Sequence, residues 1–190
     1  MGERIEIVPY RNTWPEEYAA LEQEIRAALG PLALSVDHIG STSVPGLSAK
    51  DVIDLQVTVA DLQLPVEEAL AAIGYRRLPH ITQDHQPPGR TDLTTADLAK
   101  QFYKYSKRNV NLHVRQHGNF NQHYPLLCRD YLRSHPFAAR AYEEIKQQLA
   151  KYFPDNVDAY YDIKDPVFDI IMEGAYEWQK NQHTPEISRK

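Results

Sequence analysis

From His38 to Val59 the sequence reads "HIGSTSVPGLSAKDVIDLQVTV", a Gly-Ser-Thr-Ser turn between two apolar segments, with Asp54 inside the second. Residues two apart in a strand share a face of the sheet. Asp54, Gln56 and Thr58 therefore form a polar row along this segment. The opposite row is apolar and consists of Ile53, Leu55, Val57 and Val59. The pattern predicts a strand with its apolar row against a core and a carboxylate on its other side.

A second segment, "NVNLHVRQ" at 109–116, repeats this alternation. Its apolar row is Val110, Leu112 and Val114, and its polar row is Asn109, Asn111, His113 and Arg115. The polar face of a half-buried strand commonly meets solvent. Asn, Gln, His and Asp are nevertheless the side chains that suit a site for a ligand or a metal. We expect Asp54, Gln56, Asn111 and His113 to share one face of one sheet, with the turn at 40–43 on its rim.

Composition indicates one ordinary domain. The chain has 190 residues, of which 42% are apolar and 25% charged, enough for a sizeable core. We assign residues 1–180 to this domain and 181–190 to a flexible tail. A net charge of −5 disfavours binding to long nucleic acid. The single cysteine, Cys128, the charged first residues and the lack of a long apolar run predict a soluble cytoplasmic protein without a membrane segment.

Hydrophobic periodicity predicts an α+β fold. Strands are expected at "IEIVPY" and at 32–39, 51–59, 100–106 and 109–116, and helices at 14–29, 65–74, 121–135 and 136–153. A last helix is expected to open at Asp165-Pro166, because proline favours the first turn of a helix. Residues 78–97 are rich in proline and polar side chains and predict a long loop. The expected architecture is a mixed sheet backed by helices, with a helical C-terminal layer.

Four segments together resemble the GrpB-like family over residues 5–180: "HIGSTSVPGLSAKDVIDLQV", "NLHV", "RDYLRSHP" and "AYEEIKQQLAKYF". The order of Gly40-Ser41 and Asp54 is also similar to that in nucleotidyltransferases of the DNA polymerase beta type. The resemblance implies a nucleotidyltransferase-like fold that takes a nucleotide or a phosphorylated small molecule. Because members of the family occur fused to dephospho-CoA kinase, it also implies a link to coenzyme A biosynthesis.

The sequence departs from active nucleotidyltransferases at the metal site. Those enzymes hold two metal ions with three carboxylates, which orient an in-line attack. Here Gln56 stands at the second acidic position, and the neighbouring strand offers Asn111 and His113. Such a set is a poor magnesium site but could hold one manganese or zinc ion. Asp54 and His113 are thus the candidate catalytic and metal-binding residues, with His113 alternatively a phosphate contact or a general base.

Phosphate binding is predicted around the turn. A glycine permits close approach of the backbone to a ligand, and three hydroxyls follow it. Lys50 and Arg108 could each reach a phosphate, although a solvated loop lysine and a charged hairpin are the ordinary alternatives. The candidate phosphate or nucleotide ligands are Gly40, Ser41, Thr42, Ser43, Lys50, Gln56, Asn111, Arg108 and Lys164.

Three functions remain open from the sequence: an intact or degenerate transferase, a non-catalytic nucleotide-binding or regulatory module, and a domain whose polar sheet face docks a protein. Additional carboxylates near Asp54, such as Asp84 or Asp92 of the long loop, would favour the first. A phosphate-sized pocket without further acids would favour the second, and a flat open face the third.

Overall fold

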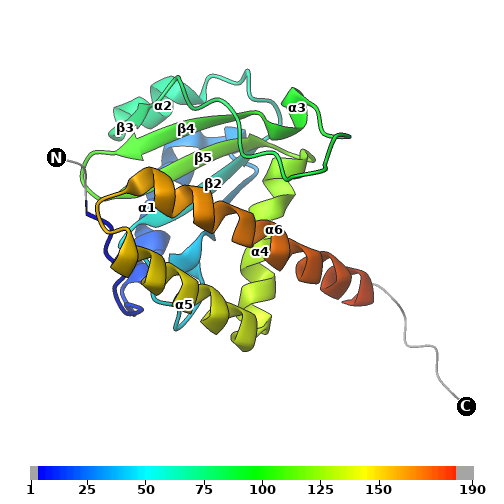
Figure 1. Cartoon of the computed structure of the whole chain (residues 1–190). Coiled ribbons are helices and arrows are strands. Elements are labelled where there is room, and N and C mark those ends of the chain that lie inside the picture. Colours follow the sequence, from blue (N-terminus) through cyan, green and yellow to red (C-terminus); the bar gives the residue numbers. More distant parts are fainter. Residues whose placement is uncertain (1–3, 183–190) are drawn as a thin grey trace, which may run out of the picture.

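The computed structural model describes residues 4–182, and its centre is a mixed five-stranded sheet (Figure 1). The order is β1-β2-β5-β4-β3, with bounds Ser35–Ile39 for β1, Ile53–Val59 for β2, Tyr75–Arg77 for β3, Lys100–Tyr105 for β4 and Val110–Gln116 for β5. Neighbours pair antiparallel except β2 and β5, which are parallel. In that pair Asp54 lies beside Asn111 and Gln56 beside His113. The expectation that these four residues share one sheet face is confirmed.

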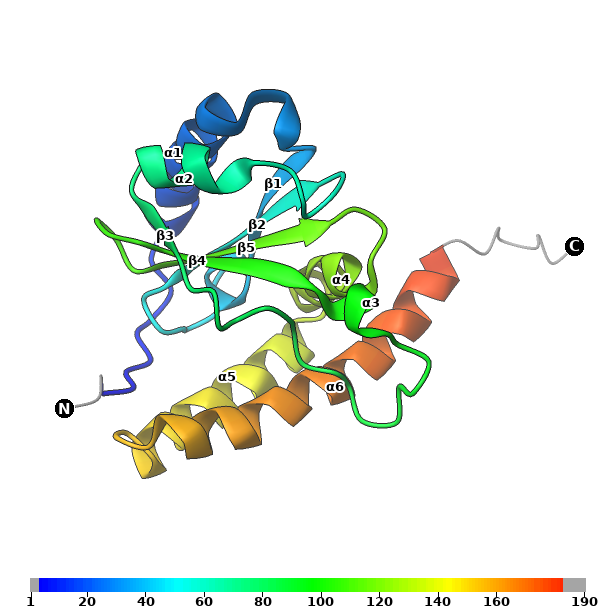
Figure 2. The same ribbon diagram turned by 90° about the horizontal axis from the view of Figure 1, so that it is seen from above.

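Two helices, α1 (Trp14–Leu29) and α2 (Val66–Ala72), cover the apolar face of the sheet (Figure 2). The apolar rows of β2 and β5 pack there against Trp14, Ile25 and Leu70, all fully buried. The spacing of three and four between apolar residues of α1 directs them to this core. The polar rows therefore point to the opposite side.

Three further helices lie on that opposite side: α4 (Phe120–Ser134), α5 (Pro136–Tyr152) and α6 (Val157–Gln182). They form a second core with members such as Leu127, Tyr142 and Met172. The predicted α+β architecture, with a helical C-terminal layer, is confirmed. The polar face of the sheet is consequently covered by protein, and Gln56 is fully buried.

The start predicted for the last helix is wrong. α6 begins at Val157, and Pro166 lies inside it. Proline removes one backbone hydrogen bond from a helix, but α6 continues because residues on both sides of Pro166, Tyr160 and Ile171, are buried in cores. The helix also extends to Gln182, beyond the start expected for the tail; residues 183–190 lie outside the described part of the chain. Among residues 4–182, no helix is both long and apolar enough to cross a membrane.

Two further differences concern short segments. The predicted first strand contributes only an isolated bridge between Val8 and Ala49. The long loop is confirmed from 78 to 94, and it ends in the short helix α3 (Thr95–Leu98), which Thr94 caps. The loop runs between β3 and β4 and reaches α6, where His85 lies 3.3 Å from Asp169.

Candidate functional site

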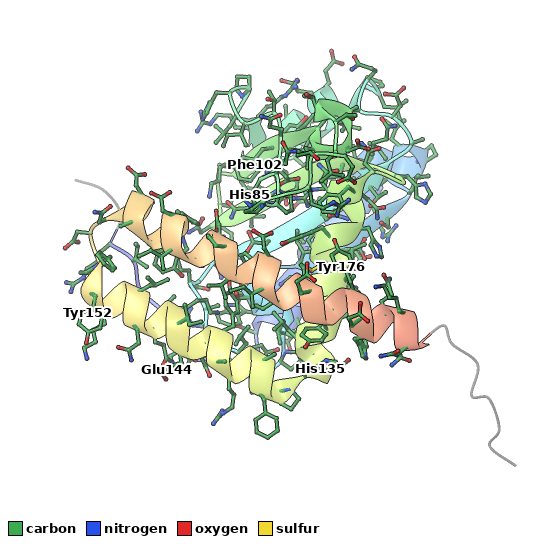
Figure 3. The ribbon with its side chains drawn as sticks, turned by 45° about the vertical axis from the view of Figure 1, so that its right-hand side comes forward. His85, Phe102, His135, Glu144, Tyr152 and Tyr176 are labelled. Atoms are coloured by element: carbon green, nitrogen blue, oxygen red, sulfur yellow. The ribbon has the colours of Figure 1, made fainter. Side chains whose placement is uncertain are left out.

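A pocket of about 360 Å³ lies between the polar face of the sheet and the C-terminal helices. Its walls come from the turn after β1, from β2 and β5, from the long loop and from α4, α5 and α6. In Figure 3, His85 of the loop lies between the sheet and α6. The polar face of the sheet therefore forms one wall of a pocket, and α4, α5 and α6 form the other walls. This shape does not match the flat, open face expected of a domain that docks a protein.

Asp54 lies directly beneath the glycine turn. Its Oδ1 accepts a 2.7 Å hydrogen bond from Asn111 Nδ2. Gly40 has a φ of +69°, and a Cβ at that position would be 2.4 Å from Asp54 Oδ2. Only glycine therefore fits this backbone conformation and this approach. Burial raises the pKa of the Asp54 carboxyl, and the Asn111 hydrogen bond and the charges of Lys50 and Lys164 oppose that rise.

Lys50 and Lys164 come together on one aromatic ring at the pocket. Their Nζ atoms lie 4.8 and 5.0 Å from the centroid of the Tyr161 ring. Lys50 Nζ also donates to the Tyr161 hydroxyl at 2.6 Å, whereas Lys164 Nζ is paired with Asp165 at 2.8 Å. Both lysines line the pocket, so two predicted phosphate ligands from distant parts of the chain share one wall.

The three hydroxyls of the turn differ in role. Thr42 Oγ1 donates to the Val52 carbonyl at 3.1 Å, and Ser43 Oγ donates to the Gly40 carbonyl at 2.6 Å. These two hydroxyls hold the turn itself. Ser41 lines the pocket beside Tyr142, with which its side chain interacts. Ser41 and Thr42 both line the pocket, whereas Ser43 does not, and the Thr42 hydroxyl is already bonded to the Val52 carbonyl.

Gln56 and Arg108 lie outside the pocket lining, contrary to the expectation for phosphate contacts. Gln56 accepts from Arg115 Nη1 at 2.7 Å and donates to a backbone carbonyl of α4. Arg108 donates to Glu17 at 2.8 Å and forms a short ion pair with Asp51. Their polar atoms are committed to internal partners, because a buried amide and a half-buried guanidinium need such partners.

A buried ionic cluster underlies the loop side of the pocket. Asp84 accepts from Lys100 Nζ at 2.6 Å and from Arg115 Nε at 2.8 Å. Although burial raises the pKa of Asp84, the charges of Arg115 and Lys100 hold it well below its usual range. Arg115 Nη2 also lies 3.1 Å from His113 Nδ1. Burial, followed by the same two cations, places the pKa of His113 well below its ordinary value, so the imidazole is neutral and a weak general base.

The donor set does not fit a metal centre of the nucleotidyltransferase type. Within residues 4–182, no group of three or more His, Cys, Asp or Glu side chains is arranged to hold a metal ion. Asp54 is the single acid of the polar rows, and the pocket's other two acids, Asp84 and Asp165, are already paired with cations. His113 Nδ1 faces Arg115 and Lys100, which would repel a cation. Asp54 and His113 are therefore a sparse donor set, and the magnesium, manganese or zinc ion expected from the sequence stays a prediction.

The helical layer supplies pocket residues that sequence reasoning did not single out, among them Phe120, Asn121, Tyr124 and Tyr142. Their spacing along α4 and α5 is that of ordinary core residues, so no local signal marks them. Asp84, considered as an additional acid near Asp54, does line the pocket. Asp92 does not; it pairs with Arg90 in the loop.

Comparison with known proteins identifies the family and agrees with the fold. The family model described as "GrpB protein" matches residues 4–174. The conserved protein GrpB from Enterococcus faecalis is similar in structure, with a TM-score of 0.76 and 28% identity over 92% of this chain and 99% of that one. A protein named dephospho-CoA kinase from Mycobacterium tuberculosis is 37% identical over 93% of this chain. The chain spans about half the length of the curated relatives it matches first, 47% in that case. A fainter likeness, to Cid1 in complex with its short product ApU, has a TM-score of 0.49 and 17% identity.

Proposed function

The chain belongs to the GrpB protein family, and from this membership we propose that its pocket binds a nucleotide or another phosphorylated small molecule. One observation carries the proposal: Lys50, Lys164 and the Gly40-Ser41 turn converge on the wall around Asp54. Two ammonium groups and a close backbone turn are the groups that bind phosphate oxygens in other proteins. The ring of Tyr161 keeps the two cations near each other before a ligand arrives.

The proposed activity is binding without efficient transfer. A two-metal transfer needs carboxylates that hold both ions, and Gln56 is bound to Arg115 instead of facing the pocket. His113 is neutral with its Nδ1 engaged. Turnover in a magnesium-dependent nucleotidyl-transfer assay is therefore expected to be very weak or absent. Robust turnover would contradict this part of the proposal.

The ligand class includes phosphorylated relatives of coenzyme A. Relatives of about twice the length carry the name dephospho-CoA kinase, which places coenzyme A and dephospho-CoA among the compounds to test. Nucleoside mono-, di- and triphosphates, pyrophosphate and inorganic phosphate complete the panel. Each compound should be tested with and without magnesium, manganese and zinc.

Thermal unfolding measures this binding directly. A ligand at a hundred times its Kd stabilises the folded state by about 2.7 kcal/mol, which corresponds to roughly 5–10 °C in a chain of this size. Lys50→Ala should strongly reduce the rise in melting temperature, because it removes a pocket cation whose Nζ, among residues 4–182, has only the Tyr161 hydroxyl as a hydrogen-bond partner.

Lys151→Ala is the matched control. Lys151 also lies over a tyrosine, 5.0 Å from the Tyr152 ring centroid, but on the exposed side of α5 and away from the pocket. The ligand should raise the melting temperature of the Lys151→Ala variant as much as that of the parent protein. The proposal fails if no compound of the panel stabilises the protein, or if the two lysine variants respond alike.

A further inference from the structure

Within residues 4–182, two polar atoms at the loop side of the pocket have no hydrogen-bond partner. Asn121 is 2% exposed, and its Oδ1 is buried without a hydrogen bond. His113 lines the same pocket, and within residues 4–182 its Nε2 has no hydrogen-bond partner. A buried acceptor without a partner costs roughly 1–3 kcal/mol, so such an atom in a pocket wall indicates a group that a ligand would satisfy.

The neighbours of His113 determine where its proton is. Arg115 Nη2 lies 3.1 Å and Lys100 Nζ 3.5 Å from Nδ1, and both cations can only donate. Nδ1 must therefore be the acceptor, and the ring proton is on Nε2. His113 consequently presents a neutral N–H donor to the pocket.

The orientation of the Asn121 amide is determined in the same way. Its Nδ2 lies 2.9 Å from Asp84 Oδ2 and 2.9 Å from the Ala99 carbonyl oxygen. Both of these oxygens are acceptors, so the nitrogen must face them and Oδ1 must face away. Asn121 consequently keeps a neutral, unpaired acceptor within the wall of the pocket.

The donor and the acceptor are held by one carboxylate. Asp84 binds Asn121 through Oδ2 and Arg115 Nη2 through Oδ1 at 2.9 Å, and the same Nη2 contacts His113. The lysine and the arginine of the cluster already have Asp84 as counter-ion. The two atoms without a partner, His113 Nε2 and Asn121 Oδ1, are thus uncharged, and hydrogen bonds hold the side chains that carry them in place.

We infer that His113 Nε2–H and Asn121 Oδ1 form a subsite for the hydrogen-bonding edge of a nucleobase. Each nucleobase carries an acceptor next to a donor on an edge, which complements one N–H and one C=O. Phe120 and Tyr124 line the pocket beside Asn121, with ring centroids 5.5 Å apart, and offer aromatic surface to a planar base. The inference rests on the proposed function and narrows it: the phosphate end lies at Lys50 and Lys164, and the ligand is a nucleotide.

Isothermal titration calorimetry with nucleoside monophosphates and with ribose 5-phosphate tests the inference. The parent protein should bind at least one monophosphate about tenfold or more tighter than ribose 5-phosphate, which is the effect of one or two neutral hydrogen bonds. His113→Asn keeps an acceptor for Arg115 but loses the Nε2–H donor, so this preference should disappear while ribose 5-phosphate binds as before. His113→Gln, whose amide nitrogen reaches the Nε2 position, should restore the preference. Lys50→Ala should weaken both ligands equally.

Each result is decisive. Equal affinity of the parent for all monophosphates and for ribose 5-phosphate overturns the base subsite and leaves phosphate binding in place. Absence of binding by all of them also overturns the base subsite, whereas the proposed function fails only if no compound of the wider panel stabilises the protein. Because His113 is buried and its substitution can disturb folding, ¹⁵N-histidine NMR of the unmodified protein provides a second test. His113 should be the neutral Nε2–H tautomer, and its Nε2 resonance should move with a monophosphate and stay unchanged with ribose 5-phosphate. A protonated ring or an Nδ1–H tautomer would refute the assignment.

Discussion

Gly40→Ala tests the contact that joins the turn to Asp54. The new Cβ would lie 2.4 Å from Asp54 Oδ2 and 2.9 Å from Asp54 Cβ and Cγ. The Asp54 side chain is held by Asn111, so it cannot move away without losing that bond. A left-handed conformation costs a non-glycine residue about 1–2 kcal/mol, and overpacking in a buried site adds roughly 1–3 kcal/mol. We expect a total loss of between about 2 and 5 kcal/mol in the free energy of unfolding.

Gly46→Ala is the matched control for this change. Gly46 has a φ of +79°, and a Cβ there would meet nothing within 4 Å. It should therefore show only the backbone cost of about 1–2 kcal/mol. Urea unfolding of the two variants and the parent, followed by circular dichroism, measures the difference. If both variants lose the same stability, the close approach of the turn to Asp54 is not a rigid feature, and the account of Gly40 given above is wrong.

Two further predictions concern buried ionisable groups. Asp54→Asn should raise the free energy of unfolding at pH 7.5, because burial raises the pKa of Asp54 and disfavours its charge, and the gain over the parent should widen as the pH rises above about 4. An equal or lower stability of the variant at pH 7.5 would show that the carboxylate is compensated. Burial, aided by Arg133 and Arg129, lowers the pKa of His38 to about 4. Below pH 6.5 the unfolded chain then binds a proton that the folded chain does not. Lowering the pH from 8 to 5 should therefore reduce the free energy of unfolding by about 2 kcal/mol through this residue. His38→Gln should remove that part of the loss. Urea unfolding at pH 8 and pH 5 measures it, and if the pKa of His38 is ordinary, the variant and the parent will lose the same stability between these two pH values.

Much of the sheet follows from local sequence. The alternation in "DVIDLQVTV" and "NVNLHVRQ" is sufficient to orient Asp54 and Asn111, since side chains alternate by geometry in any strand. The positive φ of Gly40 is also a local property, because glycine is the residue that tolerates it. These features were predictable without knowledge of what packs against them.

The tertiary structure alone determined which polar groups face the ligand. Gln56 and His113 are neighbours on one face of the sheet, yet Arg115 contacts both. It donates a hydrogen bond to the Gln56 side chain, which is therefore not available to a ligand, and it determines the tautomer of His113. Asp84 comes from a loop without regular structure, and its role depends on Lys100 and Arg115 of other segments. Pairing between segments far apart in sequence depends on distance and burial, which determine the strength of every ion pair and hydrogen bond.

The same limit applies to Pro166 and to the helical side of the pocket. Proline at a helix start is the local preference, but packing of Tyr160 and Ile171 into two cores extends α6 through it. The sequence by itself thus determined strands β2 and β5, the glycine turn and the acid beside it, whereas it missed the short strand β3. The tertiary structure determined which side chains remain free in the pocket, because a polar group is available to a ligand only when no closer partner has already satisfied it.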